Sequence, residues 1–271
     1  MSNPVQIPSG RALPALAVSC CLVLGLALVP VVISGQKKTA GPRPTSLEAF
    51  QPGETLTYEV SWSRIITAGT AVMQVRAEPL PDGREGIAFL LTGRTTGLLG
   101  KVFPVHDLVR SMFDPRTMQS LSYSIAESYG KKRRHRTLVF DHGRNTVVFT
   151  QNDEPPRTLA VPTRVQDPLS SLYYLRIQKD FTIGRPIVIE VHDSGKNWSI
   201  EVHTLGRETV KTPAGEFAAI KVKTRPTYEG VFLGKGEAFL WLTDDARKVP
   251  VLMKSTIRIG SFVFTLTDMK P

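Results

Sequence analysis

Apolar and polar residues alternate with a period of two, in short runs, over most of this 271-residue chain. In the first run, Leu56, Tyr58, Val60 and Trp62 fall on one side. Successive side chains of a β-strand point to opposite faces, so this pattern predicts half-buried antiparallel strands. The runs are separated by Gly, Pro, Asn and Asp, which favour turns. The strands predicted after the first are 69–75, 86–94, 108–113, 119–127, 132–140, 145–150, 187–193, 198–206, 216–225, 234–242, 249–259 and 261–267.

One segment breaks this period. Asp167 is a typical N-cap before Pro168, and apolar residues follow at helical spacing as far as Arg176. We therefore predict a short helix at 168–178 that crosses the sheet. No internal repeat is evident, and neither group of strands looks closed alone. The predicted fold class is all-β, with a single curved, mostly antiparallel sheet in one domain, 50–271.

The pattern also predicts the register of one hairpin. Apolar residues alternate up to a turn-forming Ser-Gly-Lys-Asn stretch and alternate again after it. A two-residue turn at 195–196 would pair Val191 with Ile200 and Ile189 with Val202. All the apolar side chains would then share one face.

The N-terminal region contains a long uncharged segment, 12–35. A helix of about 20 apolar residues crosses a bilayer, whereas the apolar region of a signal peptide has about 7–15. Pro14 and Pro30 shorten the uninterrupted apolar helix. Residues 1–36 are therefore predicted to be either a cleaved signal peptide or a membrane anchor, and the polar stretch 37–49 a linker. Both alternatives place the rest of the chain outside the cytoplasm.

The reactive residue types form no catalytic or metal-binding pattern. Cys20 and Cys21 both lie in the apolar segment, so the domain has no thiol nucleophile and no cysteine zinc site. His192 and His203 flank one hairpin on what we expect to be a solvated face, too far apart to share a metal ion. The acidic pair 244–245 is typical of a turn. No catalytic residue, metal or cofactor is predicted.

The formal net charge is +10. The densest cluster of positive charge is a basic run in one predicted hairpin arm: Lys131, Lys132, Arg133, Arg134, His135 and Arg136. Such runs are typical of nucleic-acid binding, but an exported protein meets little nucleic acid. We expect contact with an anionic envelope component such as lipid headgroups, lipopolysaccharide or wall polymers. The alternative is an edge strand that its charges protect from aggregation.

Several aromatic residues are candidates for lining an apolar cavity: Tyr58, Trp62, Phe89, Phe239 and Trp241. A curled sheet with a helix at its mouth can enclose such a cavity. The same side chains would equally make a filled core, and the sequence is compatible with both.

A set of ordered motifs runs along the domain. Residues 50–62 (FQPGETLTYEVSW) are followed by AGTA at 68–71, and DPLSSLYYLR occupies 167–176. Further motifs lie at 212–217, 241–251 and 259–262. Together they resemble the bacterial family catalogued as domain of unknown function 3108, over roughly 50–267. The resemblance implies an exported, mostly antiparallel β domain without assigned catalytic residues, similar in architecture to half-open barrels that carry lipoproteins between membranes.

These observations predict an envelope protein, periplasmic or anchored in the inner membrane and facing the periplasm. We expect it to be non-enzymatic and to bind an amphiphilic or anionic ligand in a half-open β-barrel. One alternative is a hydrolase of envelope polymers that uses carboxylates such as Asp107 and Asp167. The other is a structural partner in an envelope complex.

Overall fold

The computed structural model of the chain describes residues 48–271, except 64, 229–230, 233–237 and 258–259. The predicted signal or anchor segment lies outside the described residues, as does nearly all of the linker. No helix in the described part is long and apolar enough to cross a membrane.

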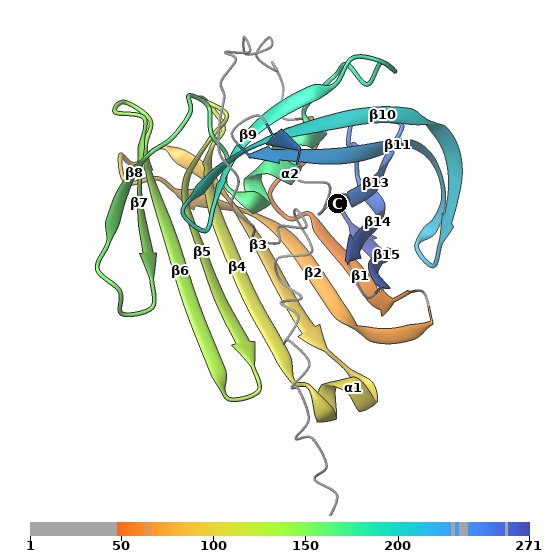
Figure 1. Ribbon diagram of the computed structural model, residues 1–271. Coiled ribbons are helices and arrows are strands. Elements are labelled where there is room, and N and C mark those ends of the chain that lie inside the picture. Colours follow the sequence, from red (N-terminus) through yellow and green to blue (C-terminus); the bar gives the residue numbers. More distant parts are fainter. Residues whose placement is uncertain (1–47, 64, 229–230, 233–237, 258–259) are drawn as a thin grey trace, which may run out of the picture.

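The described residues form fifteen strands and two short helices (Figure 1). In chain order these are β1 (Thr55–Trp62), β2 (Ile66–Pro79), β3 (Glu85–Thr95), α1 (Gly97–Val102), β4 (Val105–Asp114), β5 (Gln119–Tyr129), β6 (Lys132–Asp141), β7 (Thr146–Gln151), β8 (Arg157–Ala160), α2 (Pro168–Arg176), β9 (Ile187–Asp193), β10 (Lys196–Thr212), β11 (Gly215–Tyr228), β12 (Val231–Phe232), β13 (Ala238–Thr243), β14 (Pro250–Ile257) and β15 (Gly260–Lys270).

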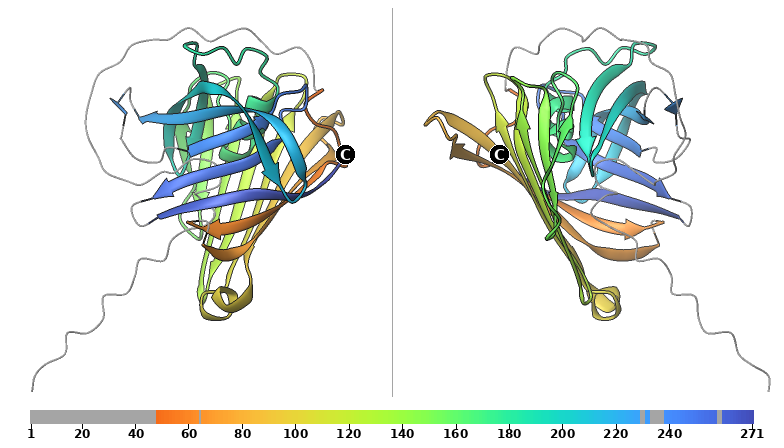
Figure 2. Two further views of the ribbon diagram at one scale, coloured as in Figure 1. Left: turned by 90° about the vertical axis from the view of Figure 1, so that its right-hand side faces the viewer. Right: turned by 60° about the vertical axis from the view of Figure 1, so that its left-hand side comes forward.

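All the strands belong to one antiparallel sheet that curls but does not close (Figure 2). The order across it is β8-β7-β6-β5-β4-β3-β2-β1-β15-β14-β13-β11-β10-β9, with β12 paired to β11. The first and last strands of the chain are therefore neighbours in the middle, and β8 and β9 form the two free ends. This confirms the predicted all-β fold, with one curved sheet and a crossing helix, α2.

Each predicted strand has a counterpart, and the predicted helix is α2, which ends at Arg176. Sequence periodicity did not reveal β8, β12 or α1, which have four, two and six residues. Elements this short contain too few residues to show a period of two or of 3.6.

The predicted register of the β9–β10 hairpin is wrong by two residues. Val191 pairs with Trp198 and Ile189 with Ile200, so the turn is Ser194-Gly195. Both turn residues have positive φ, 51° and 77°, the backbone geometry of a type I′ turn. A shift of two keeps every apolar side chain on its predicted face, so the hydrophobic pattern alone cannot distinguish the two registers.

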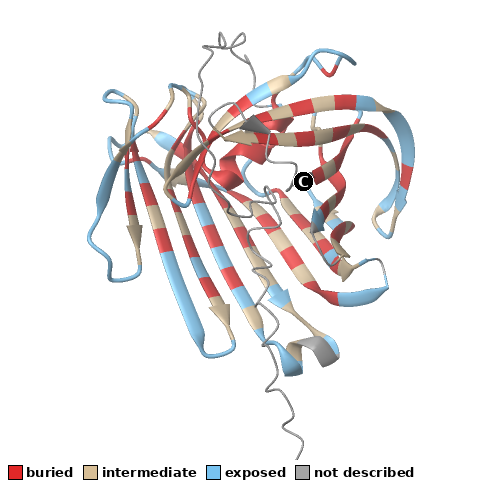
Figure 3. Cartoon of the chain, viewed as in Figure 1, coloured by how far each residue is buried: buried red, intermediate tan, exposed pale blue. Residues whose placement is uncertain are grey.

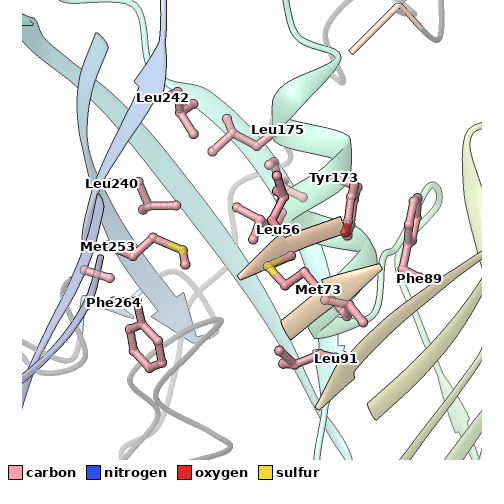
Figure 4. Close-up of a cluster of buried hydrophobic side chains, with 14 of the residues drawn as sticks. Leu56, Met73, Phe89, Leu91, Tyr173, Leu175, Leu240, Leu242, Met253 and Phe264 are labelled. Atoms are coloured by element: carbon pink, nitrogen blue, oxygen red, sulfur yellow. The ribbon is translucent and has the colours of Figure 1, made fainter. Parts of the chain in front are cut away.

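The concave face of the sheet is the apolar one, and α2 packs against one end of it (Figure 3). Strands on both sides of the curl contribute to a single core cluster, which includes Leu56, Phe89, Leu240 and Phe264 (Figure 4). At the other end of the sheet lie the β1–β2 turn, the α1 connection and the β5–β6 turn. We call this end the open rim.

Candidate functional site

The position of α2 depends on its N-cap, Asp167. The Asp167 carboxylate accepts hydrogen bonds from the backbone N–H groups of Leu169 (2.8 Å) and Ser170 (2.9 Å). It also accepts from the hydroxyls of Ser111 on β4 and Ser120 on β5. Burial raises the pKa of the Asp167 carboxyl, and these hydrogen bonds oppose the shift. Asp167 thus fastens the helix to the N-terminal strands.

Asp107 and Asp167, the carboxylates of the hydrolase alternative, do not lie together. Asp107 precedes Ser111 by four residues on β4, which is about 13 Å at strand rise. Its cross-strand neighbour is Glu127 on β5. Since Asp167 is enclosed by its hydrogen-bond donors, the two residues cannot act on one substrate bond as a pair.

Tyr58 and Phe89, two of the predicted cavity-lining residues, belong to the filled core. Both are fully buried, and the Tyr58 hydroxyl donates to the Pro250 carbonyl (2.8 Å). Phe89 stacks on Tyr173 of α2 with ring centroids 3.8 Å apart. Trp62, a third candidate, is half-buried at the open rim, where β1 ends.

Phe239 and Trp241 lie on the face of β13 opposite to Leu240, where Trp241 is nevertheless buried in the core cluster and Phe239 packs against that cluster. Their neighbour Leu240 points into the core (Figure 4). Pairing with β11 places Phe239 beside Lys223 and Trp241 beside Lys221. The two ammonium groups lie 5.7 and 5.0 Å from the ring centroids, a cation–π geometry. Both faces of β13 carry large apolar side chains, so alternation does not identify the inner one.

A small cavity lies between α2 and the C-terminal strands. Its volume is about 30 Å³, close to the space of one methylene group or water. Its lining is mostly apolar and comprises Ser171, Leu172, Leu175, Ile189, Val191, Ile200, Val202, Thr224 and Leu240. This cavity is too small for any larger guest.

Near β8 and β9, the two ends of the sheet meet through side chains. Arg136 on β6 donates to Glu127 on β5 (3.0 Å) and to the Ser194 hydroxyl in the β9–β10 turn. Its guanidinium also lies 3.6 Å from the Asp193 carboxylate. These buried contacts, which we call the seam, join the two ends where no described backbone ladder does.

The seam continues in both directions. Asn197, after the β9–β10 turn, donates to the carbonyl of Ala160 on β8 (2.9 Å). On the other side the Tyr129 hydroxyl donates to Glu127 (2.8 Å), and Glu127 neighbours Asp107 across the β4–β5 ladder. The result is a second buried polar cluster on the concave face, besides the one around Asp167.

His192 is buried beside the seam, contrary to the predicted solvated face. Its Nδ1 lies 2.7 Å from Oδ1 of Asn197, and burial lowers the pKa of the imidazole. His203 instead lies 3.1 Å from Glu201 and is partly exposed. No group of three or more potential ligands converges on a metal position among the described residues.

The basic run divides between two environments. Lys131 and the next three basic residues are exposed at the β5–β6 turn and the start of β6. Arg136 is buried in the seam, so it is not an exposed anion contact as predicted. The pairing of β6 with β7 begins only at Arg136, so the earlier residues form an edge beyond β7.

The convex side carries an open groove of about 320 Å³. Residues of β1, the β1–β2 turn, β2, β14 and β15 line it together with Lys211: Glu59, Ser61, Ile65, Thr67, Leu252 and Thr265. Lys211 is mostly exposed and paired with Glu216 (3.0 Å). No buried polar group faces this groove, so the concave face is the stronger candidate site.

The seam was not foreseen from the sequence. The sequence pattern groups Arg136 with a basic run and does not connect it with Glu127 or Asp193. A charged residue at an inward position of an alternating strand is the available signal, since such a residue requires a buried partner.

A family model described as Protein of unknown function (DUF3108) matches residues 57–267. No curated protein gives a significant match. Among solved structures, the chain is similar to the crystal structure of a β-barrel-like protein of domain of unknown function DUF1849 from Brucella abortus. The TM-score is 0.56 at 11% identity, with 80% of this chain and 96% of that one covered. This likeness concerns the fold alone.

Two further structures align more loosely. One is a Bacteroides fragilis protein provisionally described as exported, with a YmcC-like fold (TM-score 0.32, 13% identity, 82% of this chain and 97% of that one). The other is a Parabacteroides distasonis protein provisionally described as a lipoprotein (TM-score 0.33, 11% identity, 81% and 96%). Likeness at such TM-scores does not establish a shared fold.

Proposed function

The chain belongs to the family of proteins of unknown function DUF3108. For this member we propose a non-enzymatic role as an exported envelope protein. In this proposal, the concave face of its half-open barrel holds an amphiphilic guest. The supporting observation is the arrangement of this face, which is apolar in depth and polar toward the open rim. Export is inferred from the uncharged segment 12–35.

The apolar part of the face is a continuous row across four strands. Met73, Leu91, Val109 and Ile125 are successive cross-strand neighbours, and the row ends at Arg136 in the seam. All four apolar residues are buried. The row would therefore meet an acyl chain or another extended apolar group only when the sheet opens, and such a guest would gain about 0.8 kcal/mol per buried methylene.

The polar part lies one step nearer the open rim. Gly93, Asp107 and Glu127 are successive cross-strand neighbours there, and Gly93 leaves the space of a missing side chain between Ala71 and Asp107. A guest whose apolar part follows the first row would bring its head group to this second one. An amphiphile therefore fits the face better than a purely apolar molecule.

The charges of the cluster restrict the head group. Asp107, Glu127 and Asp193 provide three carboxylates, beside the guanidiniums of Arg136 and of Arg134, the cross-strand neighbour of Glu127. An anionic head group would be repelled there, so we propose an uncharged or cationic one. Anionic envelope components would meet the exposed basic residues outside the barrel instead.

The seam gives a guest a way in. No described ladder pairs β8 with β9, although backbone hydrogen bonds join Gln166, after β8, to Glu190 (2.8 Å) and His192 (2.9 Å) of β9. The two end strands would separate once these bonds and the side-chain contacts of the seam open. Arg136, Asp193 and Asn197 would lose their contacts during opening and regain them on closing. Transient separation of β8 from β9 at the seam would enlarge the 30 Å³ cavity without unfolding the sheet.

Native mass spectrometry of the purified full chain tests this proposal. We expect adducts of discrete mass, and extraction should identify them as amphiphiles with uncharged or cationic head groups. A chain that repeatedly carries no adduct, and acquires none from a mixed envelope-lipid extract, would overturn the proposal.

A further inference from the structure

The open rim exposes large apolar side chains on adjacent connections. Ile65 and Ile66 at the β1–β2 turn are 84% and 52% exposed, and Val102 and Phe103 at the end of α1 are 62% and 61% exposed. Soluble proteins expose single apolar residues routinely, but a group of them on neighbouring loops marks an interaction surface.

The third connection at this rim, the β5–β6 turn, is basic. Lys131, Lys132, Arg133 and Arg134 are exposed, and none forms an ion pair with a described carboxylate. The three rim segments 61–70, 94–106 and 128–136 contain no Asp or Glu, and their charged side chains are all Arg or Lys. The rim is therefore a positively charged surface with apolar tips.

Backbone hydrogen bonds hold the three connections side by side. The N–H of Thr96 donates to the carbonyl of Ala68 (3.2 Å), which ties the α1 connection to β2. The N–H of Gly130 donates to the carbonyl of Pro104 (3.0 Å), which ties the β5–β6 turn to the end of the α1 connection. In Figure 1 the α1 connection and the β5–β6 turn lie at the bottom of the molecule and the ends of β1 and β2 at its lower right, all away from α2.

We propose that the open rim docks on a bilayer surface that contains anionic lipids. Its apolar tips, Ile65, Ile66, Val102 and Phe103, would enter the headgroup region while the basic turn contacts lipid phosphates. Apolar side chains flanked by Lys and Arg are the composition that binds such interfaces, and each basic residue near the surface contributes about a fivefold factor in binding. This docking does not depend on a guest inside the barrel.

The experiment uses the full chain with Cys20 and Cys21 replaced by Ser, reconstituted into vesicles. In the first variant, Phe103→Cys, the single cysteine carries an environment-sensitive fluorophore. In the control variant, Ile183→Cys, the same fluorophore labels a cysteine outside the rim, at an apolar position that is 64% exposed. Vesicles are phosphatidylcholine alone or mixed with phosphatidylglycerol, with a spin-labelled lipid as quencher. We expect quenching at 103 but not at 183, and only in the mixed vesicles.

Charge variants separate the basic turn from the apolar tips. The pair Lys132→Glu and Arg134→Glu should lower the docked-to-free ratio at least about tenfold, as should high salt. The matched control Lys179→Glu with Lys270→Glu makes the same charge change at exposed positions away from the rim and should leave quenching unchanged. Equal quenching at 103 and 183, absence of quenching at 103, or quenching independent of lipid charge would each overturn the proposal.

Discussion

Arg176 and Glu54 form a fully buried, bidentate ion pair across 122 residues of the chain. The two guanidinium–carboxylate distances are 2.6 and 2.8 Å. Arg176 also donates to the carbonyls of Ala49 (2.7 Å) and Arg247 (3.1 Å), and the Arg247 side chain reaches Glu54 (3.2 Å). The pair therefore joins the segment before β1, the end of α2 and the β13–β14 turn.

Replacing one member of this pair should destabilise the fold strongly. Arg176→Met leaves the Glu54 carboxylate buried with only Arg247 beside it, and we expect a loss of about 3–5 kcal/mol. Urea unfolding followed by circular dichroism measures it. The control is Arg185→Met, whose ion pair with Asp180 is exposed (3.9 Å) and should matter little. Equal unfolding midpoints for the wild type and Arg176→Met would contradict a structural role.

The buried cap of α2 should make stability depend on pH with a distinctive sign. Burial raises the pKa of Asp167 above its unfolded value of about 3.9, so protonation is easier in the folded state. The contribution of the protonated Asp167 carboxyl to the free energy of unfolding is complete below the unfolded pKa. It is lost as pH rises through the folded pKa. Asp114, whose pKa is lowered by its ion pair with Arg84, changes stability in the opposite direction.

The variant Asp167→Asn isolates this contribution. Its amide oxygen can still accept from the N–H groups of Leu169 and Ser170, and its NH₂ group can donate to a serine hydroxyl. The unfolding free energy of the wild type minus that of the variant should fall as pH rises above about 4. A difference that is flat or rises with pH would show that the Asp167 carboxyl is not destabilised by burial.

The small cavity beneath α2 should accept one added methylene. Val202→Ile adds a group of about the cavity's 30 Å³ and should raise the free energy of unfolding by roughly 0.8 kcal/mol. Val188→Ile, on the paired strand but 37% exposed, is the control and should have a smaller effect. Destabilisation by Val202→Ile would indicate that the space is already filled.

Loosening the seam should affect the ends of the sheet first. Arg136→Gln removes a buried, charge-assisted pairing with Glu127, so amide exchange in β8 and β9 should accelerate at least about tenfold. Arg134→Gln, two residues earlier and exposed, should not produce this change. Uniform acceleration over all strands would mean that Arg136 supports the whole fold rather than the seam.

Much of the fold follows from local pattern, because alternation and turn residues are local properties. Asp167 and Pro168 are sufficient to place the start of α2. The register of the β9–β10 hairpin required knowing that Ser194 adopts positive φ, which serine does rarely. Glycine adopts positive φ readily, so Gly195 favoured the predicted turn at 195–196, with glycine first, over the observed turn at 194–195.

The candidate site depends on contacts that local pattern does not contain. Arg136 meets Asp193 57 residues later, through the curl of the sheet rather than through any spacing in the sequence. Phe239 and Trp241 were candidates for either a cavity lining or a filled core, because hydrophobicity identifies a strand without showing which side is concave; both pack in or against the core cluster. The motif residues Glu54 and Arg176 also pair beside α2, a contact that the family resemblance did not predict.

The guest proposal is tested most directly by blocking the concave face at Gly93. A Cβ at this position would lie 4.0 Å from Cβ of Asp107, an ordinary contact, so Gly93→Trp should fold and fill the polar end of the face. Thr92→Trp, the adjacent residue on the convex face, is the matched control. Native mass spectrometry of the full-length variants should show amphiphile retained by Thr92→Trp as in the wild type and lost by Gly93→Trp. Equal retention by both folded variants would contradict a guest held on the concave face.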